Sequence, residues 1–141
     1  MSISFLHSMI RIKNPETSLH FYVEGLGLEL VKKNDYPDGK FSLFFLRAPG
    51  DKAMIELTHN WEIADYTNGK NFGHLAFSVQ NIYDLCSHLR DNLKVEILRP
   101  PRNGRMAFVK DPNGISIELL QKGEALKPIE PWSSMLSKGS W

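Results

Sequence analysis

The chain contains an internal repeat in which one histidine and one later glutamate recur at matching places. The first histidine lies in the segment FLHSMIRIKN and the second in FGHLAFSVQN, and the same interval separates each from an asparagine. The glutamates lie in the segments MIEL and SIEL. Two copies of one module, each with an imidazole and a carboxylate, favour a duplicated, pseudo-symmetric fold. The repeated residues are His7 and Glu56 in the first copy, and His74 and Glu118 in the second.

Hydrophobic periodicity predicts the same order of elements in both copies, β-α-β-β-β. In the first copy we expect strands over 5–13, 28–34, 41–47 and 53–59, and a helix that begins after Asn14. In the second copy we expect strands over 73–79, 94–98, 105–110 and 115–121, and a helix over 82–91 that begins after Asn81. Asparagine is a favoured residue at a helix N-cap, and Pro15 suits the first helical position.

These elements predict an α+β fold in which two βαβββ modules form curved, mixed sheets around a metal-lined cavity. We expect a single domain over 1–121, with repeats over about 5–59 and 73–121. A tail over 122–141 shows no periodicity but holds two tryptophans, Trp132 and Trp141. These suggest that the tail packs on another surface, for which a partner subunit is one candidate.

Composition narrows the class of protein. The chain has 42% hydrophobic residues and a formal net charge of only +1, which describes a globular protein with a core and without a clustered basic face. No apolar run is long enough for a signal peptide or a membrane span. Cys86 is the single cysteine, so no disulfide framework exists within the chain. We therefore expect a cytoplasmic protein that binds neither nucleic acid nor membranes.

Strand alternation places the four repeated residues away from the core. Successive side chains of a strand point to opposite faces, and in all four strands the histidine or glutamate alternates with apolar residues. The four polar groups could therefore line one cavity. His59 falls on the opposite face from Glu56. His20 and His88 fall in the helices, where we expect no acidic or histidine partner at a useful spacing, and we interpret all three as surface or interfacial residues.

Two imidazoles and two carboxylates suit a divalent first-row metal ion, because no thiolate is available to select a softer metal. Nickel, zinc and cobalt all fit this set of ligands. The alternative for each residue taken alone is a solvated glutamate or a hydrogen-bonded histidine without a metal. An ion with open coordination positions could hold two neighbouring oxygens of a substrate while a nearby carboxylate moves a proton.

The sequence resembles glyoxalase I (lactoylglutathione lyase), of the vicinal oxygen chelate superfamily, from about His7 to Gln121. The segments that carry this resemblance are FLHSMIRI, SLHFYVEGLGLEL, SLFFL, AMIELTHNW, NFGHLAFSV and AFVKDPNGISIEL. The resemblance implies that the protein isomerises the hemithioacetal of methylglyoxal and glutathione to S-lactoylglutathione, a reaction that detoxifies methylglyoxal.

The resemblance also assigns roles to individual residues. It implies one divalent metal per site, nickel first, bound by His7, Glu56, His74 and Glu118. Glu118 is implied as the main base and Glu56 as the second carboxylate, while the metal chelates both oxygens of the enediolate. It further implies a homodimer, in which His7 and Glu56 of one chain meet His74 and Glu118 of the other.

Glutathione contacts follow from the same resemblance. Arg11 matches an arginine that pairs with a glutathione carboxylate, and Asn60 and Lys70 match further contacts. The loop over 99–105 is shorter than in compact bacterial members and holds three arginines, of which Arg102 is the expected substrate contact. The loop could bind a carboxylate or admit a different thiol adduct, so the identity of the thiol stays open.

Two other classes stay open at this point. One is another enzyme of the superfamily, such as a thiol transferase, an epimerase or an extradiol-type dioxygenase. The other is a metal-free protein that sequesters a small molecule. Those enzymes typically use three protein ligands, and a metal-free protein does not need four, so the complete set of four favours the lyase.

Overall fold

The protein is described here by a computed structural model, which covers residues 1–63 and 65–141. It divides into two compact units, Met1–Thr67 and Asn68–Trp141, and each unit contains one copy of the predicted repeat. None of the helices described is both long and apolar enough to span a membrane. The expected cytoplasmic location stays a prediction.

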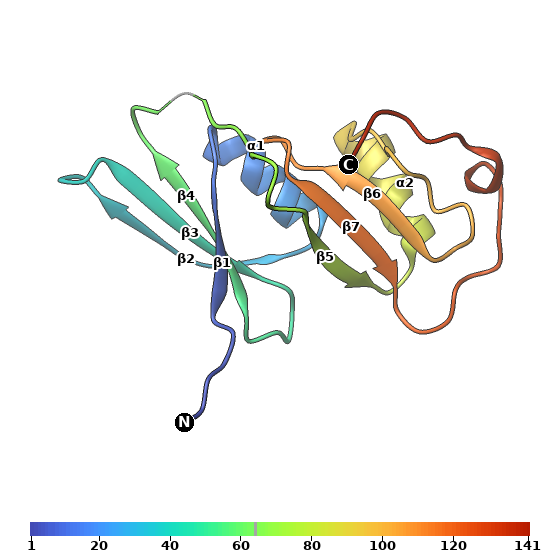
Figure 1. Ribbon diagram of the computed structural model, residues 1–141, viewed down its shortest axis with the longest axis horizontal. Helices are drawn as coiled ribbons and strands as arrows, with labels where there is room; N and C mark the ends of the chain where they lie inside the picture. Colours follow the sequence, from blue (N-terminus) through green and yellow to red (C-terminus); the bar gives the residue numbers. More distant parts are fainter. Residues whose placement is uncertain (64) are drawn as a thin grey trace. The chain divides into compact units, whose positions relative to one another are not determined.

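The first unit is built on a four-stranded mixed sheet (Figure 1). Its strand order is β1-β4-β3-β2, with β1 parallel to β4 and the other pairs antiparallel. The strands are β1 (His7–Arg11), β2 (Glu29–Tyr36), β3 (Phe41–Arg47) and β4 (Met54–Asn60). The central strands β3 and β4 alternate buried and half-buried residues, as the sequence predicted.

The helix of the first unit begins at the predicted cap. The side chain of Asn14 accepts a hydrogen bond from the backbone N–H of Thr17, and Pro15 occupies the first position of α1 (Pro15–Leu19). The helix continues without a break as the π-helical turn η1 (His20–Gly25). Its end is set by Gly27, which has a φ of 79°, a value that side-chain-bearing residues rarely adopt.

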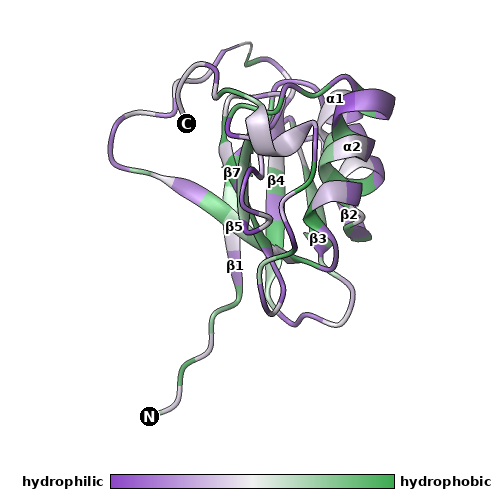
Figure 2. Ribbon diagram, turned by 90° about the vertical axis from the view of Figure 1, so that its right-hand side faces the viewer, coloured by the Kyte–Doolittle hydropathy of each residue, from purple (hydrophilic) through white to green (hydrophobic). Residues whose placement is uncertain are grey.

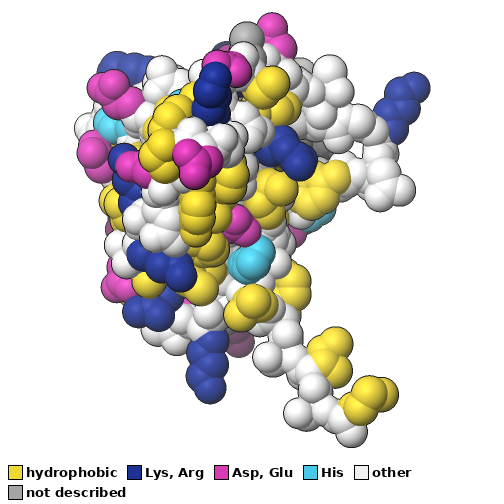
Figure 3. Space-filling model, turned by 90° about the vertical axis from the view of Figure 1, so that its left-hand side faces the viewer, with side chains coloured by type: hydrophobic (Ala, Val, Ile, Leu, Met, Phe, Trp, Pro, Cys, Tyr) yellow, Lys and Arg dark blue, Asp and Glu magenta, His cyan; other side chains and the backbone are white. Residues whose placement is uncertain are grey.

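Before β1, the chain forms an extended arm. Residues Met1–Leu6 are exposed, and the N-terminus lies away from the sheet in Figures 1 and 2. The arm carries hydrophobic side chains, which Figure 3 shows along its length. It joins the sheet where the backbone N–H of Met54 donates to the carbonyl of Leu6.

The second unit contains a three-stranded sheet with the order β5-β7-β6. Strand β5 is parallel to β7, and β6 is antiparallel to β7, which repeats the arrangement of β1, β4 and β3. The strands are β5 (His74–Val79), β6 (Met106–Lys110) and β7 (Ser116–Gln121). The α+β fold with two related mixed sheets is therefore confirmed.

The strand predicted over 94–98 is wrong. Residues 94–98 form no strand, and an isolated bridge follows at Arg99, which pairs with Phe108. Pro100 and Pro101 follow at once, and proline has no backbone N–H with which to extend a ladder. The second module is consequently βαββ with a single bridge in place of the second strand.

Helix α2 (Ile82–Leu93) packs on β6 and β7. Asn81 caps it as predicted, because its side chain accepts from the backbone N–H groups of Tyr83 and Asp84. The helix is amphipathic, with hydrophobic and hydrophilic residues both visible along it in Figure 2.

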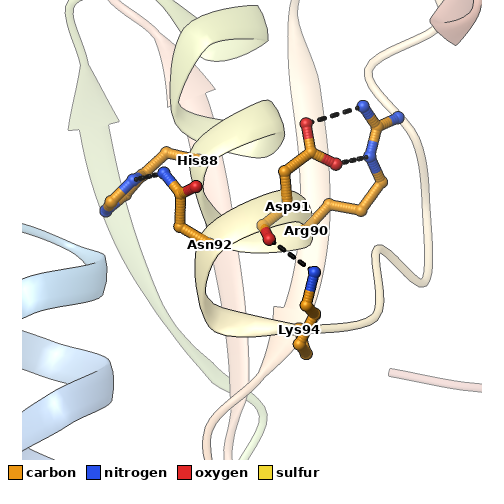
Figure 4. A network of polar contacts seen from close by, with 5 residues as sticks. All are labelled: His88, Arg90, Asp91, Asn92 and Lys94. Atoms are coloured by element: carbon orange, nitrogen blue, oxygen red, sulfur yellow. Dashed lines mark hydrogen bonds and ion pairs between the residues drawn. The ribbon is translucent and has the colours of Figure 1, made fainter.

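The C-terminal end of α2 carries a network of polar contacts, which Figure 4 shows. The side chain of Arg90 binds the carboxylate of Asp91, and Lys94 donates to the Asp91 carbonyl. The side chain of His88 contacts that of Asn92.

The segment 122–141 packs on the second unit itself. Trp132, in the short helix η2 (Trp132–Ser134), is only 2% exposed, and the guanidinium of Arg90 lies 4.7 Å from its ring centroid. The hydroxyl of Tyr83 donates to the carbonyl of Lys127. The tail therefore covers part of its own unit, and the burial of Trp132 needs no partner subunit.

Candidate metal centre

The first half of the candidate site lies on β1 and β4. The parallel register places Met9 beside Glu56, so His7, two residues before Met9, lies diagonally across from Glu56 on the same face. The Nε2 atom of His7 is 2.8 Å from an Oε atom of Glu56. The two side chains are 31% and 13% exposed. The opposite face carries Ile10 and Leu57, which are buried.

The second half repeats this geometry on β5 and β7. The parallel register places Ala76 beside Glu118, so His74 lies diagonally across from Glu118. The Nε2 atom of His74 is 3.6 Å from an Oε atom of Glu118, and the side chains are 42% and 17% exposed. One histidine thus lies near one glutamate on the sheet of each unit, with a longer contact in the second.

A phenylalanine lies beside each histidine–glutamate pair, on β3 in the first unit and on β6 in the second. The sequence did not predict either residue as part of the site. Phe45 lies opposite Glu56 and Phe108 opposite Glu118 in the antiparallel register. The ring of Phe45 meets His7 nearly at right angles, with centroids 6.1 Å apart. Phe108 meets His74 in the same way at 5.3 Å. The signal that could have identified them is strand register, because each phenylalanine is the residue that a hairpin would place opposite the glutamate.

Neither pair by itself supplies the four ligands that the sequence predicts. Within each described unit, no third histidine, cysteine, aspartate or glutamate joins the pair to form a larger group. Each pair therefore offers one imidazole nitrogen and one carboxylate as donors. This donor set fits a divalent first-row ion such as nickel, cobalt or zinc.

The predicted substrate contacts occupy different surroundings. Arg11 is exposed at the end of β1, opposite Thr58, and Asn60 ends β4 two residues beyond Thr58. The amide of Asn60 donates to the hydroxyl of Tyr66 at 3.0 Å. Lys70 is exposed in the connection before β5. Arg11 and Asn60 thus lie at the same end of two paired strands, on the face that carries His7 and Glu56.

The arginines of the loop 99–105 all donate to main-chain carbonyls. Arg99 donates to the carbonyl of Met106, and Arg105 to that of Gly123. Arg102 donates both to the carbonyl of Met135 and to the hydroxyl of Ser137, so its guanidinium holds the segment 122–141. A substrate carboxylate would compete with these contacts for Arg102.

The remaining histidines and the cysteine lie outside the candidate site. Contrary to the prediction, His20 does have an acidic partner, because its Nδ1 atom is 2.8 Å from the carboxylate of Glu24, one helical turn along the chain. His59 is half-buried on β4 opposite Ser42. Burial raises the pKa of the Cys86 thiol to about 12, so Cys86 is a core residue rather than a nucleophile.

Comparison with known proteins identifies the family. The protein-family model described as Glyoxalase/Bleomycin resistance protein/Dioxygenase superfamily matches residues 4–119 of the chain. The chain belongs to this superfamily. The match ends just after Glu118, so it includes both halves of the candidate metal centre and excludes most of the segment 122–141.

Several relatives that match most of the chain are named lactoylglutathione lyase. A probable lactoylglutathione lyase of Synechocystis is 43% identical over 123 residues, which cover 82% of this chain and 93% of that protein. The lactoylglutathione lyase of Neisseria meningitidis serogroup A is 39% identical, covering 83% and 89%. The structure of the trypanothione-dependent glyoxalase I of Leishmania major aligns with a TM-score of 0.79 at 35% identity, covering 86% and 88%. The predicted resemblance to glyoxalase I is confirmed.

Proposed function

We propose that the protein is a lactoylglutathione lyase, which converts the hemithioacetal of methylglyoxal and a thiol into the lactoyl thioester. The observation that carries this proposal is the recurrence of one arrangement, a histidine, a glutamate and a phenylalanine on three adjacent strands, in both units. The similarity to the Synechocystis and Neisseria enzymes supports it.

The four proposed metal ligands are His7, Glu56, His74 and Glu118, with nickel as the first candidate and cobalt or zinc as alternatives. An ion bound there would supply Lewis acidity to two neighbouring oxygens of the substrate. The phenyl rings of Phe45 and Phe108 pack against the two imidazoles, which limits the orientations that each histidine can adopt.

The proton transfer is assigned to Glu118. The reaction breaks the C–H bond at C1, which carries the sulfur and the hydroxyl, and forms a C–H bond at C2, which was the ketone. The hydroxyl on C1 loses its proton as C1 becomes the thioester carbonyl, and the ketone oxygen on C2 gains a proton as C2 becomes the alcohol. Glu118 takes the proton from C1 and returns it to C2, and Glu56 is the second carboxylate.

The structure supports this order of the two carboxylates. Glu56 is within hydrogen-bonding distance of His7 at 2.8 Å, whereas Glu118 is 3.6 Å from His74 and beyond that range. The Glu118 carboxylate is therefore not held by a hydrogen bond to the histidine of its own sheet. Glu118 is only 17% exposed, which limits exchange of the abstracted proton with water.

Arg11, Asn60 and Lys70 are the proposed contacts to the thiol. Arg11 offers a planar guanidinium that can bind a carboxylate through two hydrogen bonds. Arg102 would join them only by releasing Met135 and Ser137. Glutathione is the proposed thiol, and the similarity to the trypanothione-dependent Leishmania enzyme makes trypanothione the thiol to compare with it.

The proposed assembly is a homodimer in which the half-sites of two chains combine. Among the described residues, the sheet of each unit carries one such histidine–glutamate pair, so a complete set of four ligands requires both kinds of half-site. The exposed arm Met1–Leu6, with its hydrophobic side chains, supplies surface that a second chain could bury.

The proposal is tested on protein stripped of metal with a chelator and then reloaded with nickel, cobalt or zinc. Thioester formation from methylglyoxal is followed by absorbance, with glutathione and trypanothione in separate reactions. We expect nickel or cobalt to restore more turnover than zinc, and the stripped protein to be inactive. Equal turnover without metal, or no thioester with any metal and either thiol, would contradict the proposal. Greater recovery with zinc would change only the assigned metal.

A further inference from the structure

A second aromatic contact extends the second half-site into the segment 122–141. Trp141 stacks on Phe108, with ring centroids 5.7 Å apart and an interplanar angle of 22°. Phe108 in turn meets the ring of His74 at 5.3 Å and 87°. The imidazole of a proposed metal ligand is therefore joined through two ring contacts to a residue beyond the part of the chain that the family model matches.

The phenylalanine of the first half-site has a different neighbour. There the ammonium of Lys32 lies 4.7 Å from the centroid of Phe45, and Phe45 meets His7. The two half-sites thus share a histidine, a glutamate and a phenylalanine, but a cation covers the phenyl ring in one and an indole covers it in the other. This difference makes Trp141 specific to the second half-site.

Backbone hydrogen bonds hold Trp141 near the ring that it covers. The N–H of Lys138 donates to the carbonyl of Leu98 at 2.8 Å, and the N–H of Leu98 donates to the carbonyl of Phe108 at 2.9 Å. Three residues beyond Lys138, the chain reaches Trp141, whose ring returns to the side chain of Phe108. The segment is therefore tied to Phe108 through both its main chain and its side chain.

His74 depends on this contact more than His7 depends on Phe45. His7 is fixed by a 2.8 Å contact with Glu56, whereas the contact between His74 and Glu118 is 3.6 Å. His74 is also the more exposed of the two, at 42% against 31%. The ring of Phe108 consequently supplies a larger share of the packing that orients His74.

We propose that Trp141 is a positioning residue for His74, acting through Phe108, so that the segment 122–141 is part of the second metal half-site. This inference rests on the proposed function for the metal itself. Trp141 stacks on Phe108, and its proposed role is to restrict the orientations of Phe108 and so of the imidazole.

The test uses the full chain and measures metal binding rather than turnover. The variants are Trp141→Ala, Trp141→Phe, and Leu136→Ala as a control from an exposed position in the same segment. Stripped protein is titrated with nickel in competition with a chromophoric chelator, and the visible spectrum of the cobalt-loaded protein is recorded. The melting temperature of each metal-free variant reports on the fold.

We expect Trp141→Ala to weaken nickel binding by about 3- to 10-fold, the range that corresponds to the loss of one aromatic pair, and to alter the cobalt spectrum. Trp141→Phe should recover most of the affinity, and Leu136→Ala should match the wild type. Should Trp141→Ala lower the melting temperature of the metal-free protein, Trp141→Leu, which keeps apolar cover without a ring, is used in its place.

The outcomes separate this inference from the proposed function. Nickel affinity in Trp141→Ala or Trp141→Leu equal to that of the wild type, with an unchanged cobalt spectrum, would overturn the positioning role and leave the lyase proposal standing. A wild-type protein that binds none of nickel, cobalt and zinc would overturn both.

Discussion

Glu118 and Glu56 occupy equivalent positions in the two repeats but differ in how closely a histidine holds them. We expect Glu118→Gln to reduce turnover by about 100- to 10,000-fold, because an amide cannot accept the proton, a loss typical of removing a general base. The amide oxygen can still coordinate, so the variant should retain part of its metal. Turnover is measured by thioester formation and metal content by elemental analysis.

Glu24→Gln is the matched control for this prediction. Glu24 also contacts a histidine at 2.8 Å, but it does so on an exposed helix outside the candidate site. Its substitution should leave turnover and metal content unchanged. Turnover of Glu118→Gln equal to that of the wild type would show that Glu118 is not the base, regardless of the turnover measured for Glu24→Gln.

The carboxyl of Asp35 should make the stability of the fold depend on pH. The hydroxyl of Ser42 donates to Asp35 at 2.6 Å and lowers the pKa of its carboxyl; burial opposes this shift, and Lys33 adds to it. A carboxyl whose pKa is lower in the folded than in the unfolded chain stabilises the fold above its unfolded pKa, about 3.9. That stabilisation disappears as the pH falls through the folded pKa.

As the pH is lowered below about 5, we therefore expect the free energy of unfolding to decrease less steeply in Asp35→Asn than in the wild type. Denaturant unfolding at a series of pH values measures this slope. Asp38→Asn, in the exposed turn after β2, is the comparison, and an acid dependence in Asp35→Asn as steep as in the wild type would refute the assignment.

At the scale of elements, the start of α2 is set by side chains from two places in the sequence. Asn81 accepts from two N–H groups of the first turn, and the side chain of Gln121 on β7 accepts from the N–H of Ile82. We expect Asn81→Ala to lower the free energy of unfolding by about 1 kcal/mol, the usual cost of losing such a cap. Chemical denaturation measures it, with Asn71→Ala, from an exposed connection, as the control. A loss no greater than that of the control would show that Gln121 alone suffices.

The elements also show where periodicity fails as a guide. Strands whose apolar residues alternate over a whole ladder, such as β4 and β7, were predicted to within about two residues. The segment 94–98 has the same alternation but forms no strand, and the prolines at 100 and 101 keep the single bridge at Arg99 from extending further along the chain. Alternation of polar and apolar residues predicts which face of a strand each side chain occupies. A β-ladder also requires backbone N–H and C=O groups that can pair between the two strands.

At the scale of the whole molecule, the decisive question is whether one site draws on two chains. Two double variants answer it. His7→Gln with Glu56→Gln disables the first half-site, and His74→Gln with Glu118→Gln disables the second. Each should be inactive alone. If the site combines half-sites from different chains, refolding the two variants together creates heterodimers in which one complete set of ligands survives.

With random pairing, half of the dimers are mixed and each has one intact site, so the mixture should regain about a quarter of wild-type turnover per chain. Thioester formation before and after joint refolding provides the measurement. A mixture that stays inactive, although size measurements show dimers, would indicate that each site is completed within a single chain.

The sequence alone determined the duplication, the α+β class, the two helix caps and the four candidate ligands, because each is written in local spacing or in the alternation of polar and apolar residues. Tertiary structure decided which side chains meet. Phe45 and Phe108 face the histidines through strand register, and Trp141 reaches Phe108 through hydrogen bonds from Lys138 to Leu98. Such contacts join residues far apart in the chain, and no local pattern specifies them.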